Sequence, residues 1–172
     1  VNGGADLYLN DELVTDLIIP NSVTSIKDEA FSGCKSIASV TLPECLTSIG
    51  WCAFYGCTSL NAITCKATTP PASDSNAFLY VDKSIPVYVP ISSVEAHKKA
   101  SCWNEFTNIL GIRVILDSGV CGDNLTWTLF DGGELIIEGT GAMNNYPNAL
   151  SPWDNRRTSI TKVIVQNNVT SI

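Results

Sequence analysis

The side chains of this sequence that could do chemistry are, first of all, seven cysteines and a single histidine among 172 residues. Because seven is odd, at least one thiol has no partner within the chain. Cys45 with Cys52, or Cys102 with Cys121, could form disulfides on export, and the sequence does not choose among the connectivities. No two cysteines have the Cys-x-x-Cys spacing, and one histidine cannot complete a zinc site, so we expect no metal ion.

His97 lies beside Lys98 and Lys99, with no nucleophile motif next to it. We therefore expect an exposed helix residue rather than a general base. The acidic residues are scattered, whereas a polysaccharide-cleaving β-helix presents carboxylates from successive turns to one groove. The chain is thus predicted to be non-enzymatic and to use no cofactor.

The charge balance excludes some classes of partner. Asp and Glu number 17 against 10 Lys and Arg, for a net charge of −7. This balance offers no basic surface to nucleic acid or to an anionic membrane. No apolar run approaches the ~18 residues of a spanning helix, so we expect no membrane insertion.

The elements that must position these side chains recur every 23 residues. Leu17–Ile26 (LIIPNSVTSI) matches Val40–Ile49 (VTLPECLTSI), and Ala30–Cys34 (AFSGC) matches Ala53–Cys57 (AFYGC) at the same shift. Such a period is typical of stacked repeats, in which each turn buries its inner side against its neighbours.

Two further copies are less regular. A third begins at Ile63 and keeps Ala77-Phe78 after one inserted residue, and Ile85–Pro90 is a fourth short strand. Ser92–Glu95 has a capping-box pattern, which predicts a short helix to about Ala100. We interpret this helix and the bulky apolar stripe after it as a cap on the stack. The stripe consists of Trp103, Phe106 and Ile109.

Stacking predicts columns of inward-facing side chains. Two apolar columns follow the strands, one of Leu17, Val40, Ile63 and Val87, the other of Ile19, Leu42, Cys65 and Val89. An aromatic and an aliphatic column follow the turns, formed by Phe31, Phe54 and Phe78 and by Ile26 and Ile49. Cys34 and Cys57 occupy equivalent positions, and we expect small core residues there rather than a disulfide or a metal pair.

The pattern changes from Asp117 onward. Apolar alternation over 125–129 and 135–137, around Asp131-Gly132-Gly133, predicts a β-hairpin. Asp123, Asn124 and Asp131 lack the spacing of a calcium loop and are expected to be turn residues.

The last residues predict a return of the repeat. Ser151–Asp154 indicates a helix start with proline at the first helical position, and Val163–Ile172 reproduces the opening of the first copy. We therefore divide the chain into a repeat array over residues 1–112, with its cap at about 85–112, and a second part over 117–172. The second part is predicted to be a hairpin cap and the first strands of another, truncated array.

These motifs carry a family resemblance. The unit Ile-Pro-x-Ser-Val-Thr-Ser-Ile, followed by Ala-Phe-x-Gly-Cys, resembles the BspA-type (Treponema pallidum-type) leucine-rich repeat of bacterial cell-surface proteins. Ile85–Ile109 resembles the closing segment of that family, and Cys121–Met143 resembles the hairpin that opens many of its arrays. The resemblance implies a β-rich (α/β) right-handed solenoid with a parallel sheet, exported to the cell surface. Lys27 departs from the glycine that is usual after Thr-Ser-Ile.

The remaining candidate site is the outward face of the strands, formed by Asp16, Ile18, Ser39, Thr41, Thr64 and Tyr88. A flat polar row with an exposed Ile and a Tyr suits a protein-binding face. An ordinary solvated sheet face, with β-branched residues chosen for strand propensity, explains the same pattern.

The resemblance favours a non-catalytic adhesion or host-interaction module at the cell surface or secreted. Its partner would be a host, matrix or neighbouring-cell protein, or a surface glycan. A structural spacer that holds another domain away from the envelope is the alternative, and a polysaccharide-active enzyme is the third hypothesis.

Overall fold

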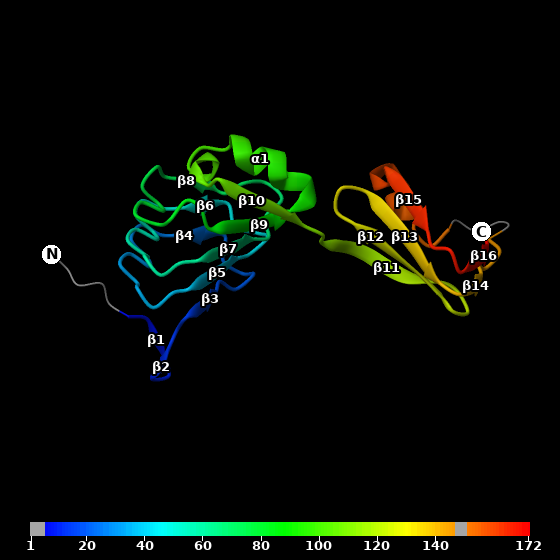
Figure 1. Ribbon diagram of the computed structural model, residues 1–172, viewed down its shortest axis with the longest axis horizontal. Coiled ribbons are helices and arrows are strands. Elements are labelled where there is room, and N and C mark those ends of the chain that lie inside the picture. The colour runs from blue at the N-terminus through cyan, green and yellow to red at the C-terminus, as the bar shows by residue number, and fades with distance from the viewer. Residues whose placement is uncertain (1–5, 147–150) are drawn as a thin grey trace. The chain divides into compact units, whose positions relative to one another are not determined.

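The computed structural model describes residues 6–146 and 151–172. It divides into two compact units, residues 1–112 and 113–172, whose elements are labelled in Figure 1. No helix among the described residues is long and apolar enough to span a membrane. The two units are described separately below.

The first unit is built around a five-stranded sheet in which all neighbours are parallel. Its strands, in spatial order, are β3 (Asp16–Ile18), β5 (Ser39–Leu42), β7 (Ala62–Cys65), β9 (Pro86–Pro90) and β10 (Asn108–Ile112). Leu17 lies opposite Val40, and Val40 lies opposite Ile63. The 23-residue interval of the sequence is therefore the register of the sheet, as predicted.

A second, smaller parallel sheet runs along the turns. It pairs β4 (Ser25–Ile26) with β6 (Ser48–Ile49), and β6 with β8 (Ala72–Ser73). A short antiparallel hairpin of β1 (Tyr8–Leu9) and β2 (Glu12–Leu13) precedes β3. Over the first three copies, the chain thus returns to the same two sheets once per repeat.

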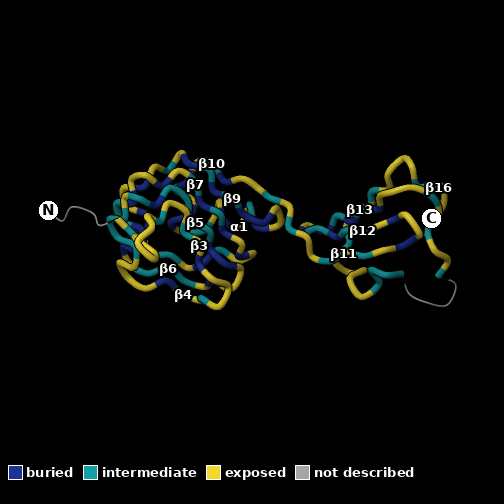
Figure 2. Tube along the Cα trace, turned by 90° about the horizontal axis from the view of Figure 1, so that it is seen from below, coloured by how far each residue is buried: buried dark blue, intermediate teal, exposed yellow. Residues whose placement is uncertain are grey.

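The predicted columns form the core of this unit. The rings of Phe31 and Phe54 stack at 5.3 Å between centroids, and those of Phe54 and Phe78 stack at 5.3 Å. Ile26 and Ile49 are buried in register. Both strand columns are buried except at Leu17, which is half-buried in the end strand, and Figure 2 shows burial along β5, β7 and β9. Burial of each such side chain contributes about 1.5–3 kcal/mol, so these columns dominate stability.

The predicted cap is present, with one strand more than expected. It contains the 3₁₀ turn Ile91–Ser93, α1 (Val94–Lys99) and the 3₁₀ turn Trp103–Glu105. Trp103 and Phe106 pack on Phe78, with ring centroids 5.6 and 5.5 Å away. Ile109, predicted to belong to an apolar stripe only, also lies in strand β10.

The short helix predicted from Ser92–Glu95 is present, whereas the predicted exposure of His97 is wrong. Ser93, at the N-cap of α1, makes no capping hydrogen bond with its side chain, and its hydroxyl donates to the carbonyl of Pro90 at 2.9 Å. His97 is fully buried rather than exposed. Its ring contacts Trp103 edge to face, and its Nδ1 lies 3.1 Å from the carbonyl oxygen of Ser93. The side of α1 that carries His97 therefore faces the core, while Lys98 and Lys99 face solvent.

The second unit contains the predicted hairpin within a four-stranded sheet. The sheet is formed by β11 (Ile115–Gly122), β12 (Leu125–Phe130), β13 (Glu134–Gly139) and β15 (Lys162–Val165). Asp123 and Asn124 form the turn before β12, as predicted. Gly132 and Gly133 have φ of 84° and 83°, so this turn needs glycines.

The final segment of the second unit runs parallel to the hairpin. β15 pairs with β13, and β16 (Val169–Ser171) pairs with β14 (Gly141–Ala142), both in parallel. The predicted helix is a 3₁₀ helix over Asp154–Ser159 with Trp153 at its N-cap. Pro152 therefore precedes the helix and does not occupy its first position, which corrects the prediction.

Candidate binding face

The predicted face residues lie on four neighbouring strands but fall into two rows. Asp16 lies opposite Ser39, whose hydroxyl donates to Asp16 Oδ1 at 2.6 Å. The register places the other four predicted residues in a single row across the sheet. That row is Ile18, Thr41, Thr64 and Tyr88.

The row continues onto the fifth strand, which the sequence prediction missed. Leu110 lies opposite Tyr88 and is 41% exposed. The spacing of Trp103, Phe106 and Ile109 had indicated only a cap. The missed signal was an interval of 22 residues between Tyr88 and Leu110, close to the repeat period.

The five residues of this row, which we call the sheet row, are all uncharged. Ile18 at one end is 71% exposed, and Thr41, Thr64 and Tyr88 between the ends are half-buried. An open groove lined by residues 7–10 and 12–18 adjoins Ile18, between the β1–β2 hairpin and β3. The row can therefore contact a flat partner surface without desolvating a charge.

The repeat geometry can now be compared with known proteins. A family model described as a BspA-type leucine-rich repeat region of six copies matches residues 4–114, more than half of the chain. The chain belongs to the BspA-type leucine-rich repeat family. Among curated proteins, none matches it significantly. The resemblance inferred from the Thr-Ser-Ile and Ala-Phe-x-Gly-Cys motifs is confirmed, and the matched range coincides closely with the first unit.

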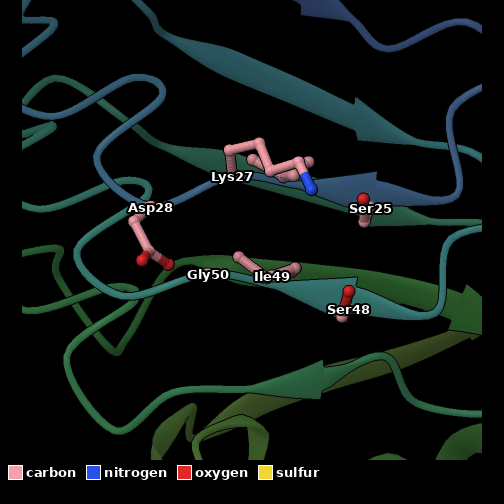
Figure 3. A pocket seen from close by; sticks show the side chains of 7 residues that line it. Ser25, Lys27, Asp28, Ser48, Ile49 and Gly50 are labelled. Carbon is pink, nitrogen blue, oxygen red and sulfur yellow. The ribbon is translucent and has the colours of Figure 1, made fainter.

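Gly50 of the BspA-type unit must be a glycine because the backbone of the preceding turn lies against it. Figure 3 shows Gly50 beside Asp28 in a groove between β4 and β6. A Cβ on Gly50 would collide with the Asp28 carboxylate and would lie 2.6 Å from its backbone nitrogen. That carboxylate accepts the Trp51 backbone N–H at 2.8 Å. Lys27 occupies the equivalent position of the turn before.

The seven cysteines of this BspA-type chain are free thiols in the structure, and Cys45 and Cys52, both in the first unit, do not form a disulfide. Burial raises the pKa of Cys57 to about 12, which disfavours the thiolate that a metal or a nucleophile needs. Its Sγ lies 3.1 Å from the Phe31 carbonyl oxygen, to which it donates. Cys57 is thus a small core residue, as predicted, whereas Cys34, for which the same was predicted, is half-buried at the edge of the core. Residues 6–146 and 151–172 contain no group of three or more His, Cys, Asp or Glu that could hold a metal ion.

Family membership indicates a repeat module for protein interaction. BspA-type repeats are typically non-catalytic. Four of the five residues of the sheet row belong to the predicted face, and the strand register aligns them.

Proposed function

We propose that this BspA-type chain is a non-catalytic binding module of a cell-surface or secreted protein. Its first unit is then a right-handed solenoid, and the sheet row contacts a host, matrix or neighbouring-cell protein, or a surface glycan. Family membership supports the location, because proteins with this repeat are generally at the surface or secreted. The predicted residues Asp16 and Ser39 border the row and belong to the same proposed face.

The observation that carries this proposal is the unbroken sheet row across five parallel strands. It combines two exposed aliphatic ends with a tyrosine, and no charge interrupts it. The cores of protein interfaces are depleted in charged residues and enriched in tyrosine. Ile18 is 71% exposed. A sheet face that only contacts water gains nothing from exposing so large an aliphatic side chain.

We propose a domain organisation of a repeat array over residues 1–112 and the start of a second array over 117–172. In the second unit, Leu135 of the hairpin lies opposite Val163, and Ile137 lies opposite Val165. The hairpin then covers the first strand of the second array as an N-terminal cap does in repeat proteins.

The test is binding of the purified chain to extracellular matrix proteins and to glycan arrays. We expect Tyr88→Ala and Thr41→Asp to weaken binding by about 30-fold, as for a residue at the centre of an interface. Thr58→Asp, at an exposed turn position, is the matched control. Bound partners that neither substitution affects would remove the sheet row from the proposal and favour the spacer hypothesis.

A further inference from the structure

The third turn breaks the repeat pattern at a position where the backbone is left-handed. The first two turns have glycine there, with φ of 73° at Gly33 and 66° at Gly56. The third turn keeps the same conformation, with φ of 65°, but carries Tyr80. The structure shows this equivalence through backbone hydrogen bonds, since Gly33 donates to Tyr55 and Gly56 donates to Leu79.

A tyrosine is an unfavourable choice at such a position. Left-handed φ brings Cβ close to the backbone, and a bulky residue there is an outlier in structures. Strained residues of this kind persist where they serve a function. Core packing does not account for Tyr80, because its side chain is 65% exposed.

Other exposed or half-buried apolar side chains lie on the turns of Tyr55 and Tyr80. The Tyr55 ring meets that of Tyr80 edge to face with centroids 5.2 Å apart. Leu79 is exposed next to it in the chain, and Trp51, on the same turn as Tyr55, is 46% exposed. We call Tyr55, Leu79 and Tyr80 the turn patch. It belongs to the turns between the strands, so none of its residues is part of the sheet row.

Acidic side chains lie on the turns that stack beside the turn patch. Asp28 and Glu29 begin the turn that is hydrogen-bonded to the turn of Tyr55, because Glu29 donates its backbone N–H to the Trp51 carbonyl and Gly33 donates to the Tyr55 carbonyl. Asp74 precedes the turn of Tyr80, and its carboxylate accepts the Asn76 backbone N–H at 2.9 Å. Burial, followed by the charges of these three carboxylates, raises the pKa of Cys52 on the Tyr55 turn. All three carboxylates are exposed.

Two cations lie near these turns. Lys27 is on the first turn, and the Lys83 ammonium donates to the Phe78 carbonyl at 2.7 Å and pairs with Glu105 at 3.3 Å. Because Glu105 pairs with Lys83, the three exposed carboxylates leave the surroundings of the patch acidic overall.

We propose that the turn patch binds an arginine-rich segment of a partner protein. A guanidinium group stacks on the face of an aromatic ring and pairs with carboxylates through its planar fork. The patch offers exposed tyrosine next to acidic groups, which is the combination that this cation prefers. The same carboxylates would repel phosphorylated or acidic ligands.

The test uses a fluorescein-labelled peptide of alternating glycine and arginine, with fluorescence anisotropy as the readout. We expect Tyr80→Gly to weaken binding by about tenfold, since a desolvated cation–π contact accounts for that change. Tyr80→Phe keeps the ring and should bind like the original chain. Glu29→Gln should weaken binding about threefold at low salt and have less effect at high salt.

The Tyr80→Gly variant separates binding from folding. Glycine is the residue that the other two turns use here, so we expect the melting temperature to stay the same or to rise. Tyr80→Asn, which also tolerates left-handed φ, is a second variant in case the first misfolds.

Several results would overturn the proposal. Equal binding of the arginine peptide by the original chain and Tyr80→Gly is one, and equal binding of a glycine–glutamate peptide is another. Tyr80-dependent binding of maltoheptaose without arginine binding would assign the patch to a neutral glycan instead. Tyr88→Ala in the sheet row should leave arginine-peptide binding unchanged, so this proposal and the proposed function can fail independently.

Discussion

Replacing Phe54 by alanine should destabilise the first unit far more than the same truncation of Phe31 in the aromatic column. Phe54 is fully buried and lies between two stacked rings, with Phe31 on one side and Phe78 on the other, each at 5.3 Å. Truncating a core phenylalanine costs about 3–5 kcal/mol. Each lost aromatic pair adds about 0.5–1.5 kcal/mol beyond the buried area. We therefore expect about 4–5 kcal/mol.

Phe31→Ala is the matched control, because it makes the same substitution in the same column. Phe31 is half-buried and stacks on one ring in the described structure. We expect its truncation to cost about 2 kcal/mol, roughly half of the larger effect. The difference between the two variants combines the second stacked ring with the fuller burial of Phe54.

The assay is calorimetric unfolding of the intact chain, with urea unfolding as a second measure. For a domain of this size, about 4 °C per kcal/mol converts the expected cost into a fall of roughly 15–20 °C for Phe54→Ala. The transition of residues 113–172 should not move, because each unit has its own core. A loss below about 1 kcal/mol, or one no larger than that of Phe31→Ala, would refute the stacked column as the main source of stability.

Two further predictions concern the cap and the turns. Burial holds the pKa of His97 below its ordinary value of 6.5, so the unfolded chain takes up a proton more readily than the folded chain. Stability of the first unit should be complete above about pH 6.5 and fall as the pH drops below it, and His97→Phe should flatten that dependence in melting curves between about pH 8 and about pH 5. Gly50→Ala should cost about 1–3 kcal/mol in urea unfolding, because its new methyl group would lie 2.6 Å from the Asp28 backbone nitrogen. Lys27→Ala at the equivalent position should be nearly neutral, and similar losses for the two would contradict the steric explanation.

The repeat period was sufficient to predict register, because parallel strands in a stack pair at the interval of the repeat. Leu17 opposite Val40 and Phe31 on Phe54 follow from that interval alone. The strand at Asn108–Ile112 was missed because its interval is 22 residues and because neighbouring bulky residues indicated a cap. The near-repeat interval and the bulky residues each indicated a real feature. Ile109 lies in strand β10 and also belongs to the core beneath the cap.

His97 and Tyr80 could not be predicted because their environments depend on tertiary packing. The neighbouring lysines indicated an exposed residue at 97, yet Val94, three residues earlier, marks the side of α1 that packs inward. The one-residue insertion in the third copy hid the replacement of glycine by Tyr80. Of the predicted face, four residues form one row, while the hydrogen bond from the Ser39 hydroxyl to Asp16 required the side-chain geometry.

The contact between Gly50 and Asp28 bears on how such an array can grow. Gene duplication lengthens a repeat protein by inserting whole copies, and each new copy must accept the turn before it. A duplicated second turn carries Gly50 and leaves room for the backbone of its predecessor. A duplicated first turn carries Lys27, whose Cβ would meet that backbone. We therefore expect insertions in the history of this array to descend from the second turn.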